Sequence, residues 1–170
     1  MRNYGVLAVL VVLVAAVAIG RSADLREGVA ALLPFTGTSP PDTASARILE
    51  GPVTHIVDGD TFDIRADGEV VRIRVCGIDA PERGEPGFEE ATDTMRLLIE
   101  GRSLECRQVG AGTPCDGRSE PTSYDRVVAQ CLLNGRDVAT EMVRRGVACD
   151  WPRFSGGHYA RVVDGACVIR

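Results

Sequence analysis

Two short acidic segments and two arginines carry the residue types that phosphate chemistry requires. The acidic segments are Asp58-Gly59-Asp60-Thr61 and Asp79-Ala80-Pro81-Glu82, and Arg74 precedes the second by five residues. Tyr124-Asp125-Arg126 supplies another guanidinium downstream. Carboxylates hold a hard cation and its water, while a guanidinium keeps its charge at working pH and grips phosphate. Together these residues predict a metal-dependent site that cleaves phosphodiester bonds.

Each of these motifs also has an ordinary structural explanation. Asp58-Gly59 is a common hairpin turn, the second acidic segment is typical of a polar loop before a helix, and Arg126 alone fits a solvated strand residue. Asp58 fits a turn-capping role as well as a supporting hydrogen bond to a metal site. Tyr124 fits simple packing as well as contact with phosphate or base. Only the joint occurrence of the motifs favours a functional site.

The type and spacing of these residues resemble the staphylococcal nuclease (thermonuclease) family, from about residue 48 to about residue 151. The resemblance implies that Asp60 and Asp79 bind a metal together with the backbone carbonyl of Ala80. It implies Ca²⁺ as that metal, and an oxygen-only ligand set suits a hard cation. Ala80 replaces the Thr of the best-known member, a harmless change where the backbone is the ligand.

The same resemblance assigns the remaining roles. Glu82 is expected to orient or deprotonate the attacking water, and Arg74 and Arg126 to bind the phosphate and stabilise its developing charge. Tyr124 is a candidate substrate contact. Asp125 stands where a Gly often precedes the second arginine of the family.

The activity implied is that of a calcium-dependent nuclease, largely indifferent to sequence, that cuts DNA and RNA and leaves 3′-phosphates. Contacts to phosphate and sugar carry no sequence information, which agrees with broad cutting. One alternative is a non-catalytic binding module of the same fold at the cell envelope, since relatives of one fold differ in function. Another is a secreted, disulfide-braced interaction domain, for which no calcium dependence is expected.

The pattern of apolar residues predicts a mainly β domain with helices, a five-stranded, partly open OB-type barrel with two to three α-helices. Residues 53–57 and 62–65 flank the first acidic segment, and Asp67-Gly68 turns the chain into residues 70–75. Runs of alternating residues joined by Asp-Gly predict a hairpin. Within 70–75 the apolar residues at 73 and 75 share a face, so Arg74 points away from the barrel interior.

The second half of the domain supplies the remaining strands and the helices. A stripe of apolar residues predicts a helix over Phe88–Glu100, which Gly101 ends, and Asp137 is placed to cap a second helix. The further expected elements are strands at 104–109 and 127–133, a loop at 110–123, the capped helix Val138–Arg145 and a brief helix at His158–Val163. The loop delivers Arg126 to the site.

The N-terminus differs from the rest of the chain. Residues 5–20 form an uninterrupted apolar run of 16 residues, which predicts either a cleaved signal peptide or a short membrane anchor. Residues 21–47 include many turn formers and predict a flexible linker, and residues 48–170 form the barrel domain. Either N-terminal reading predicts an exported protein, periplasmic or secreted, with the apolar run as its potential membrane tether. We expect a monomer.

The six cysteines agree with export. No Cys-x-x-Cys occurs and the two histidines lie far from any zinc spacing, so disulfides are expected. Six cysteines allow 15 full pairings. The topology of the resembled family places Cys106 and Cys131 on neighbouring strands and favours that pair, with Cys149 and Cys167 free to fix the tail. Cys76 fits a buried, unpaired hydrophobe.

The charge balance is unusual for a protein that acts on nucleic acid. The net charge is −5, and every basic residue other than the two histidines is an arginine. A broad electrostatic footprint requires the opposite sign, so substrate binding should be weak and salt-sensitive. The arginine-only composition suits bidentate phosphate contacts, but a genomic base bias explains it better.

Overall fold

The computed structural model describes residues 46–169. The expected signal peptide or anchor at 1–20 and almost all of the linker at 21–47 lie outside the described residues, so this part of the domain division stays a prediction. Within 46–169 none of the helices has the length and apolar character needed to cross a membrane.

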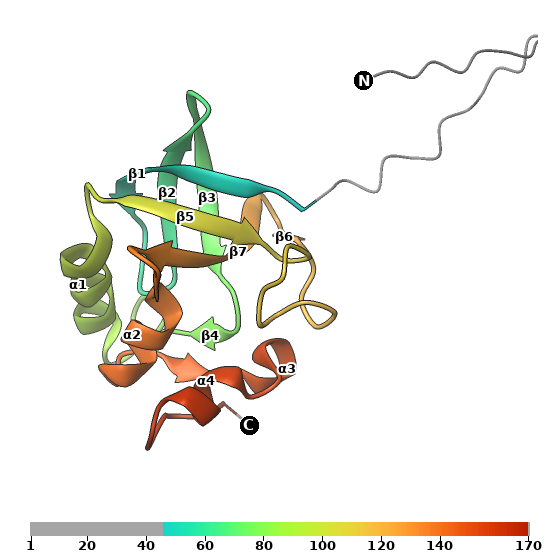
Figure 1. The fold of residues 1–170 in the computed structure, drawn as a ribbon. Helices are drawn as coiled ribbons and strands as arrows, with labels where there is room; N and C mark the ends of the chain where they lie inside the picture. The colour runs from blue at the N-terminus through green and yellow to red at the C-terminus, as the bar shows by residue number, and fades with distance from the viewer. Residues whose placement is uncertain (1–45, 170) are drawn as a thin grey trace, which may run out of the picture. The chain divides into compact units, whose positions relative to one another are not determined.

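Five strands close into a barrel (Figure 1). They are β1 (Ile48–Ile56), β2 (Thr61–Ala66), β3 (Glu69–Val75), β5 (Ser103–Gln108) and β7 (Arg126–Leu133). Neighbours in the order β3-β2-β1-β5-β7 pair antiparallel, and β3 then pairs with β7 in parallel, with Ile73 opposite Val127. This confirms the five-stranded OB-type barrel. The parallel contact makes it closed, where a partly open barrel was expected.

Four further strands of two residues each lie outside the barrel, namely β4 (Ile78–Asp79), β6 (Thr122–Ser123), β8 (Arg136–Asp137) and β9 (Cys149–Asp150). β6 and β8 pair with β7. β4 and β9 form a separate two-stranded antiparallel sheet in which Asp79 lies opposite Cys149. This small sheet was not expected, and it joins the C-terminal part of the domain to the second acidic segment.

The two longer helices agree closely with the sequence pattern. α1 (Phe88–Ile99) buries the apolar stripe of Met95 and Ile99, and α2 (Val138–Arg144) begins where the Asp137 carboxylate accepts a 2.8 Å hydrogen bond from the Ala139 N–H. α4 (His158–Val162) is the brief helix expected in the tail. α3 (Pro152–Ser155) is an additional single turn.

The barrel interior is filled by alternating strand residues. Phe62, Ile64, Ile73 and Val75 are fully buried in one cluster with the stripe of α1. Because side chains alternate along a strand, Arg74 lies on the opposite face from Ile73 and Val75, as expected.

All six cysteines are paired. Cys106 and Cys131, directly opposite each other on β5 and β7, form one disulfide, and Cys149 and Cys167 form another, which confirms both expected pairs. Cys76 is buried, but it is bonded to Cys115. The interpretation of Cys76 as an unpaired hydrophobe was therefore wrong, because the 110–121 loop folds back onto the end of β3.

Candidate active site

The first acidic segment forms the tight turn between β1 and β2. The Asp60 N–H donates to the Asp58 carboxylate over 3.0 Å, and the Asp58 N–H donates to the Thr61 carbonyl over 3.2 Å. An Asp side chain that accepts from the backbone two residues ahead stabilises a turn. Asp58 therefore has the turn-capping role, and Asp60 is held in a buried position at 4 % exposure.

Gly59 allows this turn to pack closely against its surroundings. A Cβ atom on Gly59 would lie 2.6 Å from the Cβ of Ala80 and 2.7 Å from that of Ala91 in α1. Distances below 3.0 Å cannot be accommodated without movement. The absence of a side chain at this one position lets the first acidic segment contact the second and the helix together.

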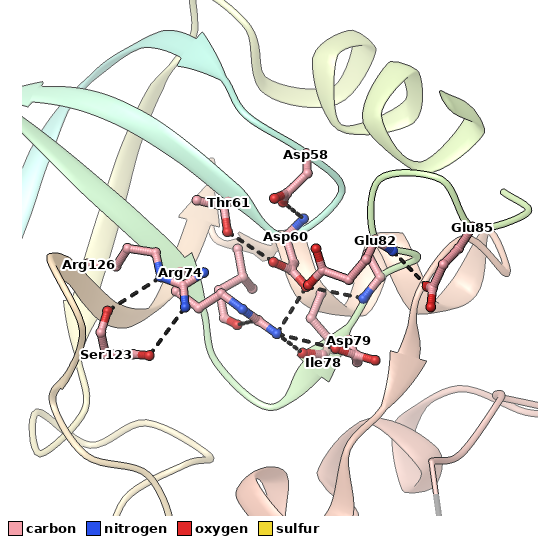
Figure 2. A network of polar contacts seen from close by, with 12 residues as sticks. Asp58, Asp60, Thr61, Arg74, Ile78, Asp79, Glu82, Glu85, Ser123 and Arg126 are labelled. Carbon is pink, nitrogen blue, oxygen red and sulfur yellow. Dashed lines mark hydrogen bonds and ion pairs between the residues drawn. The ribbon is translucent and has the colours of Figure 1, made fainter. Parts of the chain in front are cut away.

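Arg74 lies between the two aspartates that the sequence suggests as metal ligands (Figure 2). Its Nη2 is 3.0 Å from Oδ2 of Asp60 and 3.7 Å from Oδ1 of Asp79. The same nitrogen donates to the Ile78 carbonyl over 2.9 Å, and Nη1 donates to the Val75 carbonyl. The structure thus brings Asp60, Asp79 and Arg74 into one set of contacts.

The two carboxyl groups occupy an environment that disfavours their charge. Burial raises the pKa of Asp60 to about 6, although the Arg74 guanidinium lowers it and the nearby Asp58 adds to the increase. Burial also raises the pKa of Asp79, opposed by Arg74 and assisted by Glu85. Carboxylates crowded in a buried site gain most from an added positive charge.

The donor set fits a hard divalent cation. Oδ2 of Asp60 accepts a 3.1 Å hydrogen bond from the Ala80 N–H, which places the Ala80 peptide beside this carboxylate. Asp79 contacts the same nitrogen of Arg74 as Asp60 does. The potential metal ligands, namely the two carboxylates and the Ala80 carbonyl, are all oxygen atoms, as Ca²⁺ and Mg²⁺ prefer. Among residues 46–169 no group of three or more His, Cys, Asp or Glu side chains is placed to hold a metal ion. A cation here would therefore complete its coordination largely with water.

Glu82 follows β4 on an exposed loop that leads to α1. Its N–H donates to Oε2 of Glu85 over 2.8 Å, and Figure 2 shows it beside the two aspartates. Glu82 and Asp79 line the same pocket. The structure gives the Glu82 side chain no hydrogen-bond partner among the described residues, which leaves its carboxylate able to accept a proton from a water.

The second arginine reaches the pocket from the start of β7. Arg126 Nε and Nη2 donate to the carbonyl and hydroxyl oxygens of Ser123, over 3.4 and 3.3 Å, across the β6–β7 turn. Tyr124 occupies that turn with a φ of 56° and is 97 % exposed. Its ring centroid is 5.9 Å from Cζ of Arg126, but Tyr124 does not line the pocket.

The pocket has a volume of about 410 Å³ and brings residues from distant parts of the chain together. Its lining includes Arg74, Asp79, Glu82 and Arg126. Asp60 is buried beneath the lining and is connected to it by its ion pair with Arg74. The size is within the range of small-ligand sites, and the polar groups converge on it.

Two aromatic residues in the pocket wall were missed by the sequence reasoning. Trp151 and Phe154 both line it, with ring centroids 4.6 Å apart in an edge-to-face arrangement. The backbone N–H of Trp151 donates to the Gly77 carbonyl over 2.9 Å, next to the β4–β9 pair. Two aromatics within one turn of the chain are the only local signal, and they do not reveal the long-range pairing that brings them here.

The comparisons with known proteins agree with this geometry. The family described as staphylococcal nuclease homologue matches residues 72–161, more than half of the chain. This range includes Arg74, Asp79, Glu82 and Arg126. The chain belongs to the staphylococcal nuclease homologue family.

Individual relatives are more distant. The chain is 28 % identical over 108 residues to an "Uncharacterized endonuclease" of Escherichia coli, which covers 63 % of this chain and 64 % of that protein. It is 28 % identical over 145 residues to a "Probable endonuclease LCL3" of Komagataella phaffii, covering 65 % and 59 %. It is 32 % identical over 109 residues to "Protein ParB" of Escherichia coli, covering 64 % and 60 %. The chain thus matches less than two thirds of the length of each of these relatives.

Proposed function

We propose that this protein is an exported, calcium-dependent nuclease that hydrolyses phosphodiester bonds of DNA and RNA with little regard to sequence. The observation that supports this most strongly is the position of Arg74. One guanidinium contacts two carboxylates suited to a cation, in a pocket that also contains Glu82 and a second arginine. Family membership and relatives with endonuclease names support the same activity.

The cation would be held by Asp60, Asp79 and the carbonyl of Ala80. When bound, Ca²⁺ would offset the charge of a substrate phosphate and attract a water to the site. This role fits a pair of carboxylates whose pKa values are raised by burial, because the cation supplies the compensating charge. Sparse protein ligation leaves room for both the water and a phosphate oxygen.

The chemistry of the protein groups follows from their positions. Glu82 accepts a proton from the attacking water, whose oxygen forms a bond to phosphorus while the bond from phosphorus to the 5′ oxygen breaks, and the leaving 5′ oxygen takes up a proton from solvent. Arg74 and Arg126 donate to the non-bridging oxygens, each contributing about 3 kcal/mol by comparison with an oxyanion-hole donor. The products are a 3′-phosphate and a free 5′-hydroxyl.

Arg74 is suited to this role because its orientation is fixed before substrate binds. The Val75 and Ile78 carbonyls hold the guanidinium at the end of β3, and a guanidinium has more N–H donors than these carbonyls use. Donors remain for a phosphate. Substrate binding therefore does not have to order this side chain, which reduces the entropic cost of binding.

Broad substrate use is expected from the composition of the pocket. Its arginines bind phosphate, which is the same in every nucleotide, and the rings of Trp151 and Phe154 offer an apolar surface to any base. The protein's net negative charge makes binding weak and salt-sensitive.

Export is supported by the three disulfides, which persist in oxidising compartments, and by the apolar run at residues 5–20. Both a cleaved signal peptide and a retained anchor would place the barrel outside the cytoplasm. We propose that the barrel acts there as a monomer.

The test is degradation of plasmid and single-stranded DNA by the purified, oxidised protein, with either Ca²⁺ or EGTA present. The expected result is degradation only with Ca²⁺, with 3′-phosphate ends. A folded protein that binds DNA without cutting it under any of these conditions would instead be the non-catalytic binding module.

The matched control is Glu82→Gln. This variant keeps the size and the loop position of residue 82 but has no carboxylate to accept a proton. It is expected to bind calcium and DNA normally and to cut far more slowly. Equal cutting by this variant would remove Glu82 from the proposed mechanism.

A further inference from the structure

We infer that the Cys76–Cys115 disulfide is a positioning element of the substrate pocket. It holds residues 110–121, which we call the strap, against the end of β3, so that the strap forms part of the pocket wall. This inference rests on the proposed nuclease function and adds a substrate-positioning role to a bond outside the catalytic set.

Main-chain hydrogen bonds hold the two ends of the strap, from the Ala111 N–H to the Gln108 carbonyl and from the Val128 N–H to the Pro121 carbonyl, but few of its side chains are buried. It lies between β5 and β6 and consists mainly of Gly, Pro, Ser, Thr and charged residues. Of its twelve residues only Thr113 and Cys115 are buried. Cys115 belongs to a small apolar cluster with Cys76, Val109 and Val128, separate from the main core. A segment with so few buried side chains would be mobile without a covalent link.

The disulfide attaches the strap at a functionally important point. Cys76 follows Val75, the last residue of β3, and lies two residues beyond Arg74. Its N–H donates to the Ala129 carbonyl over 2.9 Å, which fixes it to β7. A Cβ on Gly77 would lie 3.0 Å from the sulfur of Cys115. The sulfur therefore rests directly on the chain between β3 and β4.

Hydrogen bonds connect the disulfide to the part of the strap that lines the pocket. The Cys115 carbonyl accepts from the N–H groups of Arg118 and Ser119, both over 3.0 Å, which makes one tight turn. Within the strap, the pocket is lined by Ser119 and Glu120, and Thr122 and Ser123 of β6 continue the same wall. The chain from the disulfide to the pocket wall is thus a single hydrogen-bonded turn.

Asp116 stiffens the first half of the strap. Its carboxylate accepts hydrogen bonds from the Gly110 N–H over 2.7 Å, the Gly112 N–H over 2.9 Å and the Thr113 hydroxyl over 2.6 Å. These bonds close residues 110–116 into a compact loop. These bonds should make the loop move as a unit, and the disulfide beside Asp116 is its covalent cross-link to the barrel besides the main chain.

The test compares two variants of the full oxidised chain, each of which lacks one of the three disulfides. Cys76→Ala with Cys115→Ala releases the strap, and Cys106→Ala with Cys131→Ala removes the cross-strand bond between β5 and β7 as the control. We expect the first pair of substitutions to raise KM for single-stranded DNA about five- to tenfold, because pocket side chains must then be ordered on binding. The kcat and the calcium concentration for half-maximal activity should stay within about twofold, since Asp60, Asp79 and Glu82 are not attached to the strap.

Limited trypsin digestion measures the strap without reference to activity. Arg118 is exposed and lies in the turn after the disulfide. We expect cleavage after Arg118 at least ~10-fold faster in the variant without Cys76–Cys115 than in the wild type or the control. Equal resistance to trypsin in all three proteins would overturn the inference, and so would an unchanged KM or an equal rise of KM in the control.

Asp116→Ala gives a second approach if the first variant does not fold. It removes three hydrogen bonds and leaves all disulfides intact, and it should raise KM and trypsin cleavage in the same direction. A KM and a cleavage rate equal to those of the wild type would count against the inference. Absence of cutting by the wild type is a different result, which rejects the proposed nuclease function, and the trypsin comparison still decides whether the disulfide orders the strap.

Discussion

The guanidinium of Arg74 lies 3.0 Å from the buried carboxylate of Asp60, and Asp79 approaches the same nitrogen to 3.7 Å. One side chain therefore balances the charge of two carboxylates that a divalent cation is also suited to bind. In the proposed function, a bound Ca²⁺ would supply this compensation in place of Arg74. Its remaining donors can then serve the phosphate, so cation binding and substrate binding should reinforce each other.

Arg74→Lys should lower kcat about 100-fold with Ca²⁺ saturating, because an ammonium is a point charge and cannot hold two carbonyls and a phosphate in a planar fork. Single-turnover cleavage of a short DNA measures the effect. The matched control is Arg72→Lys on the same face of β3, where Arg72 forms a bidentate ion pair with Asp63. That control should keep kcat within about twofold, and an equal loss in both variants would contradict a special role for Arg74.

Asp60→Asn should stabilise the protein in EGTA at neutral pH while abolishing activity. Burial raises the folded-state pKa of Asp60 to about 6, above its ordinary 3.8. Between pH 3.8 and about pH 6 the folded state therefore binds more protons than the unfolded state. Stability then falls as pH rises through this window, and Asn removes the loss. We expect a gain of roughly 1 to 2 kcal/mol at pH 7.

Urea unfolding at pH 4 and pH 7 measures this difference. The wild type in EGTA should lose more stability between the two pH values than the Asn variant. Asp79→Asn is the comparison, since Asp79 is less buried and should show a smaller change of the same sign. A large loss of stability in Asp60→Asn at pH 7 would show that the ion pair with Arg74 outweighs the burial of the carboxyl.

Gly59→Ala should destabilise the protein by about 1 to 3 kcal/mol and weaken calcium-dependent cutting, because the added methyl group overlaps Ala80 and Ala91. Denaturant unfolding and activity are the measurements. Adding Ala91→Gly removes one of the two overlapping methyl groups. The double variant should be more stable than the sum of the single effects predicts, and simple additivity would show that the overlap is not the cause.

Phe154→Leu should weaken binding of single-stranded oligonucleotides about fivefold in the Glu82→Gln background, because leucine fills the space but has no aromatic face for a base. Fluorescence anisotropy with a labelled oligonucleotide in Ca²⁺ is the measurement. Phe88→Leu, at the start of α1 and outside the pocket, is the matched control. Unchanged affinity in the Phe154 variant would mean that this ring does not contact substrate.

Local patterns predicted the elements that carry most of the site. The Asp-Gly turns, the alternation around Arg74 and the Asp137 cap are short-range signals, and each corresponds to the observed strand or helix. The helix α1 differs from its expected range by one residue. Side-chain alternation also gave the correct direction for Arg74, because a strand has only two faces.

The parts that could not be predicted depend on long-range contacts. β4 and β9 are two residues long, so neither has a periodic pattern, yet their pairing brings Trp151 next to Gly77 and into the same pocket as Asp79. The Cys76–Cys115 bond joins residues 39 apart in the sequence, and Cys115 lies in a loop with few apolar residues to suggest its position. The parallel contact between β3 and β7 that closes the barrel leaves no local signal for the same reason.

Trp151 is the only tryptophan in the chain, and it lies in the wall of the pocket. The tryptophan emission of the protein therefore comes from a single indole, in the wall of the pocket proposed to bind a nucleotide. Quenching or a spectral shift on addition of a non-hydrolysable nucleotide would report occupancy of this pocket in real time, without a label. The same protein can thus be titrated with Ca²⁺ and ligand in either order, which measures directly whether the two bind cooperatively.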